Sequence, residues 1–200
     1  MNDLLDIMRR LRGPGGCPWD QQQSHESLRP YLLEEACEAM DAIASGDPQA
    51  IVEELGDVLL QVAFHTVIAE EAGHFDYPAV EQGIVAKLIR RHPHVFGAVR
   101  VSGAEEVIRN WQAIKGAEGK AHSVPRSLPA LMRAFEAGRR AGWEEGRPEA
   151  VSQALESGND ATRHLGRLLL AVVDYARSLG VNPELALREA IEARLRHEYA

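Results

Sequence analysis

The chain has 200 residues, of which 45% are hydrophobic and 26% charged, and its formal net charge is −8. This length allows one large domain or two small ones, and the composition is that of a soluble globular protein. The negative charge disfavours nucleic acid and anionic membrane surfaces as direct partners. The amino-terminal segment lacks the apolar core of a signal peptide, and no run approaches the ~20 apolar residues of a membrane span. Because the two cysteines make no disulfide framework, we expect a cytoplasmic location.

The hydrophobic pattern predicts helices and no convincing strand. The expected fold class is therefore all-α, an antiparallel helical bundle. Asp47 and Asn182 are predicted N-caps, because each directly precedes a proline that suits a first helical turn. Ser102 and Glu105 have the spacing of a capping box. The predicted helices span residues 3–12, 27–45, 48–72, 78–91, 103–118, 128–141, 148–156, 160–179 and the segment from 183 onward.

Two predicted loops carry aromatic or histidine side chains. Residues 13–19 are rich in glycine and proline and end at Trp19. Trp19 serves either as a plug over the core or as a wall against a planar ligand such as a base. The second loop holds His92 and His94, whose spacing alone is a weak indication of a metal site.

Acidic side chains cluster on two neighbouring predicted helices. Glu34, Glu35 and Glu38 lie on the first, and Glu54 and Asp57 lie on the second. Residues three or four apart share a helix face, and the short connection makes the two helices antiparallel neighbours. The alternative is a solvated acidic face, but the apolar run after Asp57 places that residue at the edge of a core. Convergent carboxylates there predict a site for Mg²⁺, with Mn²⁺ as a substitute.

Basic and aromatic side chains follow on the next two predicted helices. Lys87, Arg90 and Arg91 either complement the helix dipole or bind phosphate beside the acidic site. Trp111 and Lys115 are four residues apart and are expected to share a face. They form either a stacking and phosphate-binding pair or an ordinary core tryptophan with a surface lysine.

The second half of the chain looks like a copy of the first. The Leu-Gly pair after Glu54 and the apolar run that follows recur after His164. His164 and Arg167 stand at the positions of Glu54 and Asp57, and an arginine excludes Mg²⁺ by charge. We therefore divide the chain into a catalytic helical domain, a linker and a degenerate, structural helical domain. Their bounds are residues 1–118, 119–129 and 130–200.

Several separate segments together resemble one protein family. The acidic motif resembles that of the all-α nucleoside triphosphate pyrophosphohydrolases, and the surrounding sequence is similar to the MazG family. The resemblance extends to about residue 135 and is specific, because the segments agree in order. The segments that carry it are Gly16-Cys17-Pro18-Trp19-Asp20, Tyr31-x-Leu33-Glu34-Glu35, Gly56-Asp57-x-Leu59-x-Gln61-Val62, Arg90-Arg91-His92-Pro93-His94-Val95-Phe96 and Pro125-Arg126-Ser127-Leu128-Pro129-Ala130-Leu131-Met132.

The resemblance implies a Mg²⁺-dependent enzyme that hydrolyses nucleoside or deoxynucleoside triphosphates to the monophosphate and pyrophosphate. The residues themselves agree: a water activated by the metal would be the nucleophile, and a base stacked on Trp111 or Trp19 would suit broad base specificity. We expect a house-cleaning or pool-regulating role. The subunits of the family form intertwined dimers, so a homodimer or higher homo-oligomer is expected. Carried over by motif, the metal ligands are Glu35, Glu38, Glu54 and Asp57, and Glu34 is a further acidic catalytic residue. The nucleotide-contacting positions carried over are Lys87, Arg91, Trp111 and Lys115; Arg90 and Trp19 are added from their own chemistry.

Two other interpretations compete with this one. A di-iron carboxylate bundle requires Glu-x-x-His pairs on two helices. In this chain, the residue three positions after Glu35 is Glu38 and the residue three positions after Glu54 is Asp57, so neither pair contains a histidine. A non-enzymatic helical scaffold for nucleotide binding or interaction would carry the acidic residues merely as surface. A metal-binding titration distinguishes the scaffold from the enzyme.

Overall fold

The computed structural model describes residues 2–118, 124–155 and 160–198. The chain divides into two compact units, residues 1–99 and 100–200. The sequence-based division into domains 1–118 and 130–200 stays a prediction, and residues 119–123 of its linker lie outside the described ranges.

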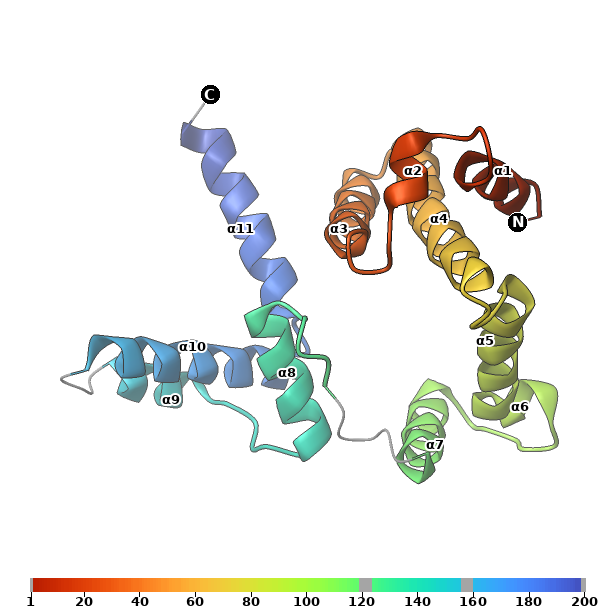
Figure 1. Ribbon diagram of the computed structural model, residues 1–200. Coiled ribbons are helices and arrows are strands. Elements are labelled where there is room, and N and C mark those ends of the chain that lie inside the picture. Colours follow the sequence, from red (N-terminus) through yellow and green to blue (C-terminus); the bar gives the residue numbers. More distant parts are fainter. Residues whose placement is uncertain (1, 119–123, 156–159, 199–200) are drawn as a thin grey trace. The chain divides into compact units, whose positions relative to one another are not determined.

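The first unit is built around one long helix, α4. Its elements are α1 (Asn2–Arg12), α2 (Pro18–Gln22), α3 (Arg29–Ser45), α4 (Pro48–Glu71), α5 (Tyr77–Arg91) and α6 (Pro93–Phe96). Both α1 and α3 pack along α4, and α5 extends from the carboxyl end of α4 (Figure 1). The core lies mainly between α1 and α4 and consists of Leu5, Met8, Leu28, Ala63, Phe64 and Val67. These apolar side chains fix α4, which carries half of the predicted acidic site.

The second unit has a smaller core. It contains α7 (Ala104–Ala117), α8 (Ala130–Ala141), α9 (Pro148–Leu155), α10 (Ala161–Ser178) and α11 (Pro183–Glu198). Helix α10 packs against α8, α9 and α11, and its Val173 is fully buried. Asp160 caps α10 by accepting a hydrogen bond from the Arg163 backbone N–H. The sequence Gly158-Asn159-Asp160 predicts this cap, and its first two residues lie outside the described residues.

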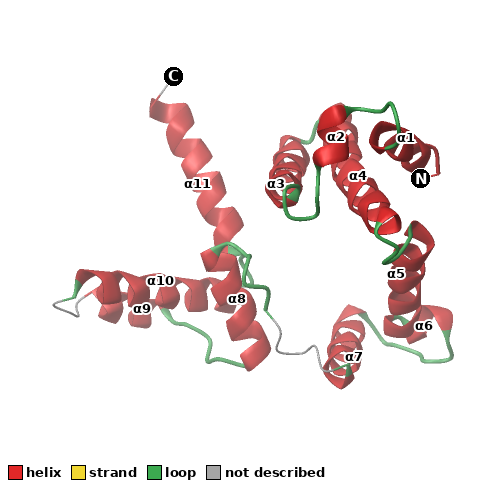
Figure 2. Cartoon of the chain, in the orientation of Figure 1, coloured by secondary structure: helices red, strands yellow, loops and turns green. Residues whose placement is uncertain are grey.

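The predicted fold class is confirmed, since the described residues form helices and loops and no strand (Figure 2). The Asp47 and Asn182 caps are also confirmed, because each side chain accepts a backbone N–H two residues ahead. None of the described helices combines the length and apolarity that a membrane crossing requires.

Three local predictions are wrong. Trp19 belongs to the short helix α2 rather than to a loop, and Pro93 begins the short helix α6. Both helices have five residues or fewer, too few for a hydrophobic period to reveal them. The capping partner of Ser102 is Glu106 rather than Glu105: the Glu106 carboxylate accepts both the Ser102 N–H and the Ser102 hydroxyl. The shift arises because Gly103 is the N-cap, which makes Glu106 the third helical residue.

Candidate functional site

The α3–α4 hairpin brings the two acidic segments together. Helix α3 ends at Gly46, whose φ of +71° favours glycine. Asp47 then caps α4, and Pro48 begins it. Glu38 and Glu54 lie at similar separations from this tight turn, and the antiparallel helices therefore place them opposite each other.

Three carboxylates converge on the hairpin. Glu35, Glu38 and Glu54 each place one oxygen such that the three oxygens lie within 4.8 Å of one another. Glu35 and Glu54 are half-buried, whereas Glu38 is exposed. In the described part of the chain, no other set of three histidine, cysteine or acidic side chains comes together in this way.

The electrostatics of these carboxylates extend the cluster to Asp57. Burial raises the pKa of Glu35, and the charges of Asp57 and Glu38 raise it further. Burial also raises the pKa of Glu54, with further contributions from Glu38, Asp57 and Glu53. Asp57 therefore shares the field of the three converging groups, although it is outside the set defined by distance. Such mutual repulsion makes the fully ionised cluster unfavourable unless a cation compensates it.

Gln61 is a site residue that the sequence interpretation left without a role. It lies one turn after Asp57 on α4 and is 4% exposed. Its side-chain amide lowers the pKa of the Glu35 carboxyl, opposing the effect of burial. The available signal was a single amide interrupting an apolar run, at the spacing that shares a face with Asp57.

Glu34 is separate from this group. It is exposed on α3 and is not among the three residues whose oxygens converge. Its predicted catalytic role stays a prediction.

Trp19 lies against the helices that carry the carboxylates. Its ring makes edge-on contacts with Tyr31 of α3, at a centroid distance of 5.8 Å, and with Phe64 of α4, at 6.4 Å. Tyr31 is one turn before Glu35, on the same face of α3. Trp19 remains 48% exposed, so it both covers the core and presents a free aromatic surface near the acidic helix.

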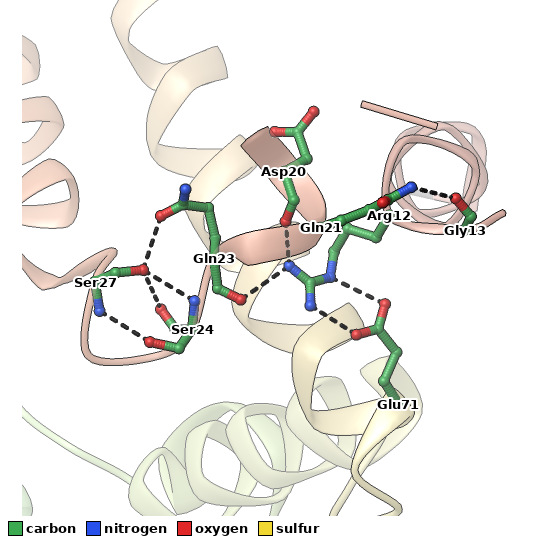
Figure 3. Close-up of polar contacts among 8 residues, drawn as sticks. All are labelled: Arg12, Gly13, Asp20, Gln21, Gln23, Ser24, Ser27 and Glu71. Carbon is green, nitrogen blue, oxygen red and sulfur yellow. Dashed lines mark hydrogen bonds and ion pairs between the residues drawn. The ribbon is translucent and has the colours of Figure 1, made fainter. Parts of the chain in front are cut away.

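Arg12 fixes the position of α2 (Figure 3). Its guanidinium donates to both Glu71 oxygens, at 2.9 and 2.7 Å, and to the backbone carbonyls of Asp20 and Gln23. It also lies 5.6 Å from the Phe64 ring centroid. This nearly buried side chain therefore ties the segment that carries Trp19 to the carboxyl end of α4.

The predicted phosphate-binding cations of the first unit lie apart from the acidic cluster. Lys87, Arg90 and Arg91 are on the last two turns of α5. Helix α5 leaves from the carboxyl end of α4, whereas Glu54 and Asp57 are on its amino-terminal half (Figure 1). Within one chain, the fold therefore does not gather these three cations around the carboxylates.

Trp111 and Lys115 belong to the second unit. The Lys115 ammonium lies 5.1 Å from the Trp111 ring centroid, which confirms that the two residues share a face of α7. Both side chains are partly exposed. Their predicted contact with a nucleotide stays a prediction.

Comparison with known proteins points to one family. A model of the MazG nucleotide pyrophosphohydrolase domain matches residues 23–96, which include Glu34, Glu35, Glu38, Glu54 and Asp57. A nucleoside triphosphate pyrophosphohydrolase of Escherichia coli K12 is 40% identical, over 94% of this chain and 82% of that protein. A nucleoside triphosphate pyrophosphohydrolase/pyrophosphatase of Thermotoga maritima is 38% identical, over 94% of this chain and 80% of that protein. The uncharacterized YabN protein of Bacillus subtilis is 48% identical, but only over 64% of this chain and 27% of its own length.

Proposed function

Because the chain belongs to the MazG nucleotide pyrophosphohydrolase family, we propose that it hydrolyses nucleoside and deoxynucleoside triphosphates to the monophosphate and pyrophosphate. In this reaction, water adds to phosphorus and the anhydride bond between the α- and β-phosphates breaks. The observation that carries the proposal is the convergence of Glu35, Glu38 and Glu54 inside the segment that matches the family. Such a cluster suits a reaction of a polyphosphate, because carboxylates can hold the divalent cation that neutralises phosphate charge.

The donor set fits a hard divalent cation. All the converging atoms are carboxylate oxygens, the ligand type that Mg²⁺ and Mn²⁺ prefer. Opposite ligands of an octahedral Mg²⁺ ion are about 4.2 Å apart, so oxygens within 4.8 Å of one another need only small side-chain rotations. The raised pKa values of Glu35 and Glu54 point the same way, because a cation would offset both the burial and the neighbouring negative charges that raise them.

Each residue of the proposed site would have a distinct role. Glu35, Glu38, Glu54 and Asp57 would hold Mg²⁺, and Glu34 would be a further acidic residue at the exposed edge. When bound, the cation would supply positive charge to the phosphates and help to activate a water molecule. The exposed face of Trp19 would stack on the base, and such stacking tolerates every base because each has a π-face. Broad base specificity follows, as suits a house-cleaning enzyme of the cytoplasmic nucleotide pool.

A homodimer would complete this site. None of the residues of α5 is buried, and five apolar side chains on it are each 38–47% exposed: Val80, Ile84, Val85, Leu88 and Ile89. Such a face is typical of a contact with another protein surface. A second copy packed there would bring Lys87, Arg90 and Arg91 to the acidic cluster that one chain leaves without them. Light scattering coupled to size exclusion tests this: we expect twice the chain mass, and a strict monomer would contradict it.

Product chromatography tests the reaction. The full-length protein is incubated with a panel of nucleoside triphosphates and Mg²⁺, without added pyrophosphatase. We expect the monophosphate and pyrophosphate in equal amounts, with no activity in a chelator control. Accumulation of nucleoside diphosphate and orthophosphate would mean that a different bond is broken. Nucleotide binding without any product would instead favour the non-enzymatic scaffold.

A further inference from the structure

We propose that His25 and His65 form a pH-sensitive latch, in which one shared proton holds the connection between α2 and α3 against α4 and protonation of both rings releases it. His25 lies in that connection, between Gln22 and Arg29, and His65 lies on α4. Their Nδ1 atoms are 2.8 Å apart, a hydrogen bond between segments that are forty residues apart in the chain. Neither residue belongs to the acidic cluster, so the latch is separate from the proposed metal site.

The two imidazole rings face each other edge to edge. Their planes differ by 8° and their centroids are 5.1 Å apart. This separation is close to the largest that a 2.8 Å contact between two ring nitrogens permits, so the contact lies along the line that joins the centroids. Each nitrogen therefore points its N–H or its lone pair at the other, which is the alignment that hydrogen bonds prefer.

Such a contact accommodates one proton. In a neutral imidazole one nitrogen donates and the other accepts, whereas both nitrogens of a protonated imidazole are donors. One ring must therefore keep a bare Nδ1 for the bond to exist. A first added proton leaves the bond intact, because the charged ring donates to the neutral one. A second added proton places two N–H groups opposite each other, and the bond breaks.

His65 is the ring that resists the second proton. Its Nε2 is buried and has no hydrogen-bond partner among the described residues, so a protonated ring would hold an unpaired N–H there. Burial lowers the pKa of His65, and the charge of His25 lowers it further. His25 is exposed to water, which supports a charge, and the first proton therefore resides on His25.

Charged side chains on the surrounding elements do not offset the second proton. The charge that shifts the pKa of His65 is that of His25 alone. On α3, the pKa of Glu35 responds to the charges of Asp57 and Glu38 and not to a histidine. The charged side chains of α1, of the far end of α4 and of the connection itself are paired with one another, as Arg9–Glu70, Arg12–Glu71 and Glu26–Arg29.

The latch lies next to the groups that position Trp19. Phe64, adjacent to the latch on α4, contacts the Trp19 ring, and the Gln23 amide donates to the Trp19 carbonyl at 2.9 Å. The connection is also held at its two ends, by Arg12 on the Gln23 carbonyl and by Leu28 in the core. Release of the latch therefore loosens the middle of the connection while the rest of the unit stays folded.

His92 and His94 provide a matched control pair. Their rings are also close, with centroids 5.7 Å apart, but the planes are tilted by 55°. The His92 Nδ1 contacts the Leu88 carbonyl at 2.7 Å instead of the other ring. This pair shares no proton, so His94→Gln removes a histidine without removing a bond between imidazoles.

The direct test is a pH titration of the full-length, ¹⁵N-labelled protein by nuclear magnetic resonance of the imidazole nitrogens. At about pH 8, we expect one protonated and one bare Nδ1 in this pair, coupled to each other through the shared proton. As the pH falls, the pair should take up its two protons in separate steps. The coupling should survive the first step and disappear at the second, together with faster amide exchange of residues 24–28. The spectrum of His25→Ala assigns the signals.

Thermal melts of variants test the energetic consequence. At about pH 8, His25→Ala should melt about 2–4 °C lower than wild type, the shift expected for one lost hydrogen bond in a chain of this size. The pKa of His65 is lowered in the folded protein, so wild type should lose stability as the pH falls below the ordinary value of about 6.5.

His25→Asn should lose less stability in acid than wild type. The asparagine amide has its polar atoms as many bonds from the backbone as Nδ1, and it can donate to a neutral His65 or accept from a protonated one. This variant should therefore melt like wild type at about pH 8. His94→Gln should follow wild type throughout.

Three results would overturn the latch. The first is an absence of coupling between the two Nδ1 atoms at about pH 8, with two rings that titrate independently. The second is an acid-induced loss of stability in His25→Asn as large as that of wild type. The third is a coupling that persists after both rings are protonated. If His25→Ala does not fold, the titration of wild type decides, with the signals assigned from His25→Asn.

Discussion

Helices α4 and α10 share the features that form a helix but differ in those that perform chemistry. Each is capped by an aspartate, Asp47 or Asp160, and each is followed by a glycine with positive φ, Gly73 or Gly180. Both carry a Leu-Gly pair followed by an apolar run. Caps, glycines and apolar residues are therefore sufficient for the fold of such a helix, whereas its function depends on a few polar positions.

The polar side chains of the two helices are acidic on α4 and basic at the aligned positions of α10. Glu54 and Asp57 on α4 face the carboxylates of α3, whereas the aligned residues on α10 are His164 and the exposed Arg167. The described part of the second unit contains no convergent acidic group. We infer that residues 130–200 are structural, and the internal repeat itself remains a prediction.

The largest expected effect is the loss of turnover when the α3–α4 cluster loses one charge. Glu38→Gln removes a proposed ligand from an exposed position, so the fold should be unaffected. Turnover should fall at least about 100-fold, because losing only a hydrogen-bond partner of a metal ligand already costs about 10–100-fold. Pyrophosphate release and circular dichroism melting provide the measurements. As the control on the other helix, Arg167→Gln should keep wild-type turnover; near-normal turnover in Glu38→Gln would sink the assignment.

The next effect concerns two arginines that anchor loops in the two units. Arg12 binds the carbonyls of Asp20 and Gln23, and Arg177 binds those of Trp143 and Glu144. Alanine at either position removes a nearly buried guanidinium together with its hydrogen bonds to these carbonyls, and should lower the free energy of unfolding by about 1–3 kcal/mol in urea melts.

Only the first of these changes should alter substrate binding. Arg12→Ala releases α2 and with it Trp19, so KM for the triphosphate should rise while kcat changes less. Arg177→Ala should leave KM as in wild type. Equal KM changes in the two variants would show that the anchor does not act through Trp19.

A smaller effect is a pH-dependent gain in metal-free stability. The pKa of Glu54 is raised in the folded protein, so its protonation favours the folded state. This contribution is present below the ordinary value of about 4.5 and is lost as the pH rises through the raised pKa. Glu54→Gln should therefore melt higher than wild type at neutral pH, and the difference should vanish in acid. His164→Gln, at the aligned position, should show no such gain; identical trends in both variants would contradict the repulsion inferred for α4.

The smallest expected effect is the failure to create a second site. His164→Glu combined with Arg167→Asp restores the acidic pattern on α10 but not the acids of a facing helix. We expect the Mn²⁺ stoichiometry of this double variant to equal that of wild type. An added tight site would show that the second unit needs only these two carboxylates to bind metal.

Local features of the molecule could be predicted from the sequence. The caps at Asp47 and Asn182 and the tight turn at Gly46 depend on neighbouring residues, so residue type and spacing revealed them. The same turn, with spacings of three along each helix, was enough to place Glu35, Glu38 and Glu54 together.

Features that depend on distant residues could not be predicted. Helix α2 is too short for a periodic signal, and a side chain from α1, Arg12, fixes it. The effect of Gln61 on the pKa of Glu35 depends on the register between α3 and α4, which no local pattern gives. The sequence also leaves open whether Lys87, Arg90 and Arg91 lie beside the carboxylates, because no local pattern gives the direction in which α5 leaves α4 (Figure 1).

The most direct test of the central assignment is a Mn²⁺ titration of the full-length protein, with free ion measured by electron paramagnetic resonance. Wild type and Glu38→Gln are compared at equal protein concentration and neutral pH. We expect tight sites in wild type and none in Glu38→Gln, because all proposed ligands lie on α3 and α4. If Glu38→Gln kept the full set of tight sites, the metal would be bound elsewhere in the chain, and the assignment of chemistry to the α3–α4 hairpin would be contradicted.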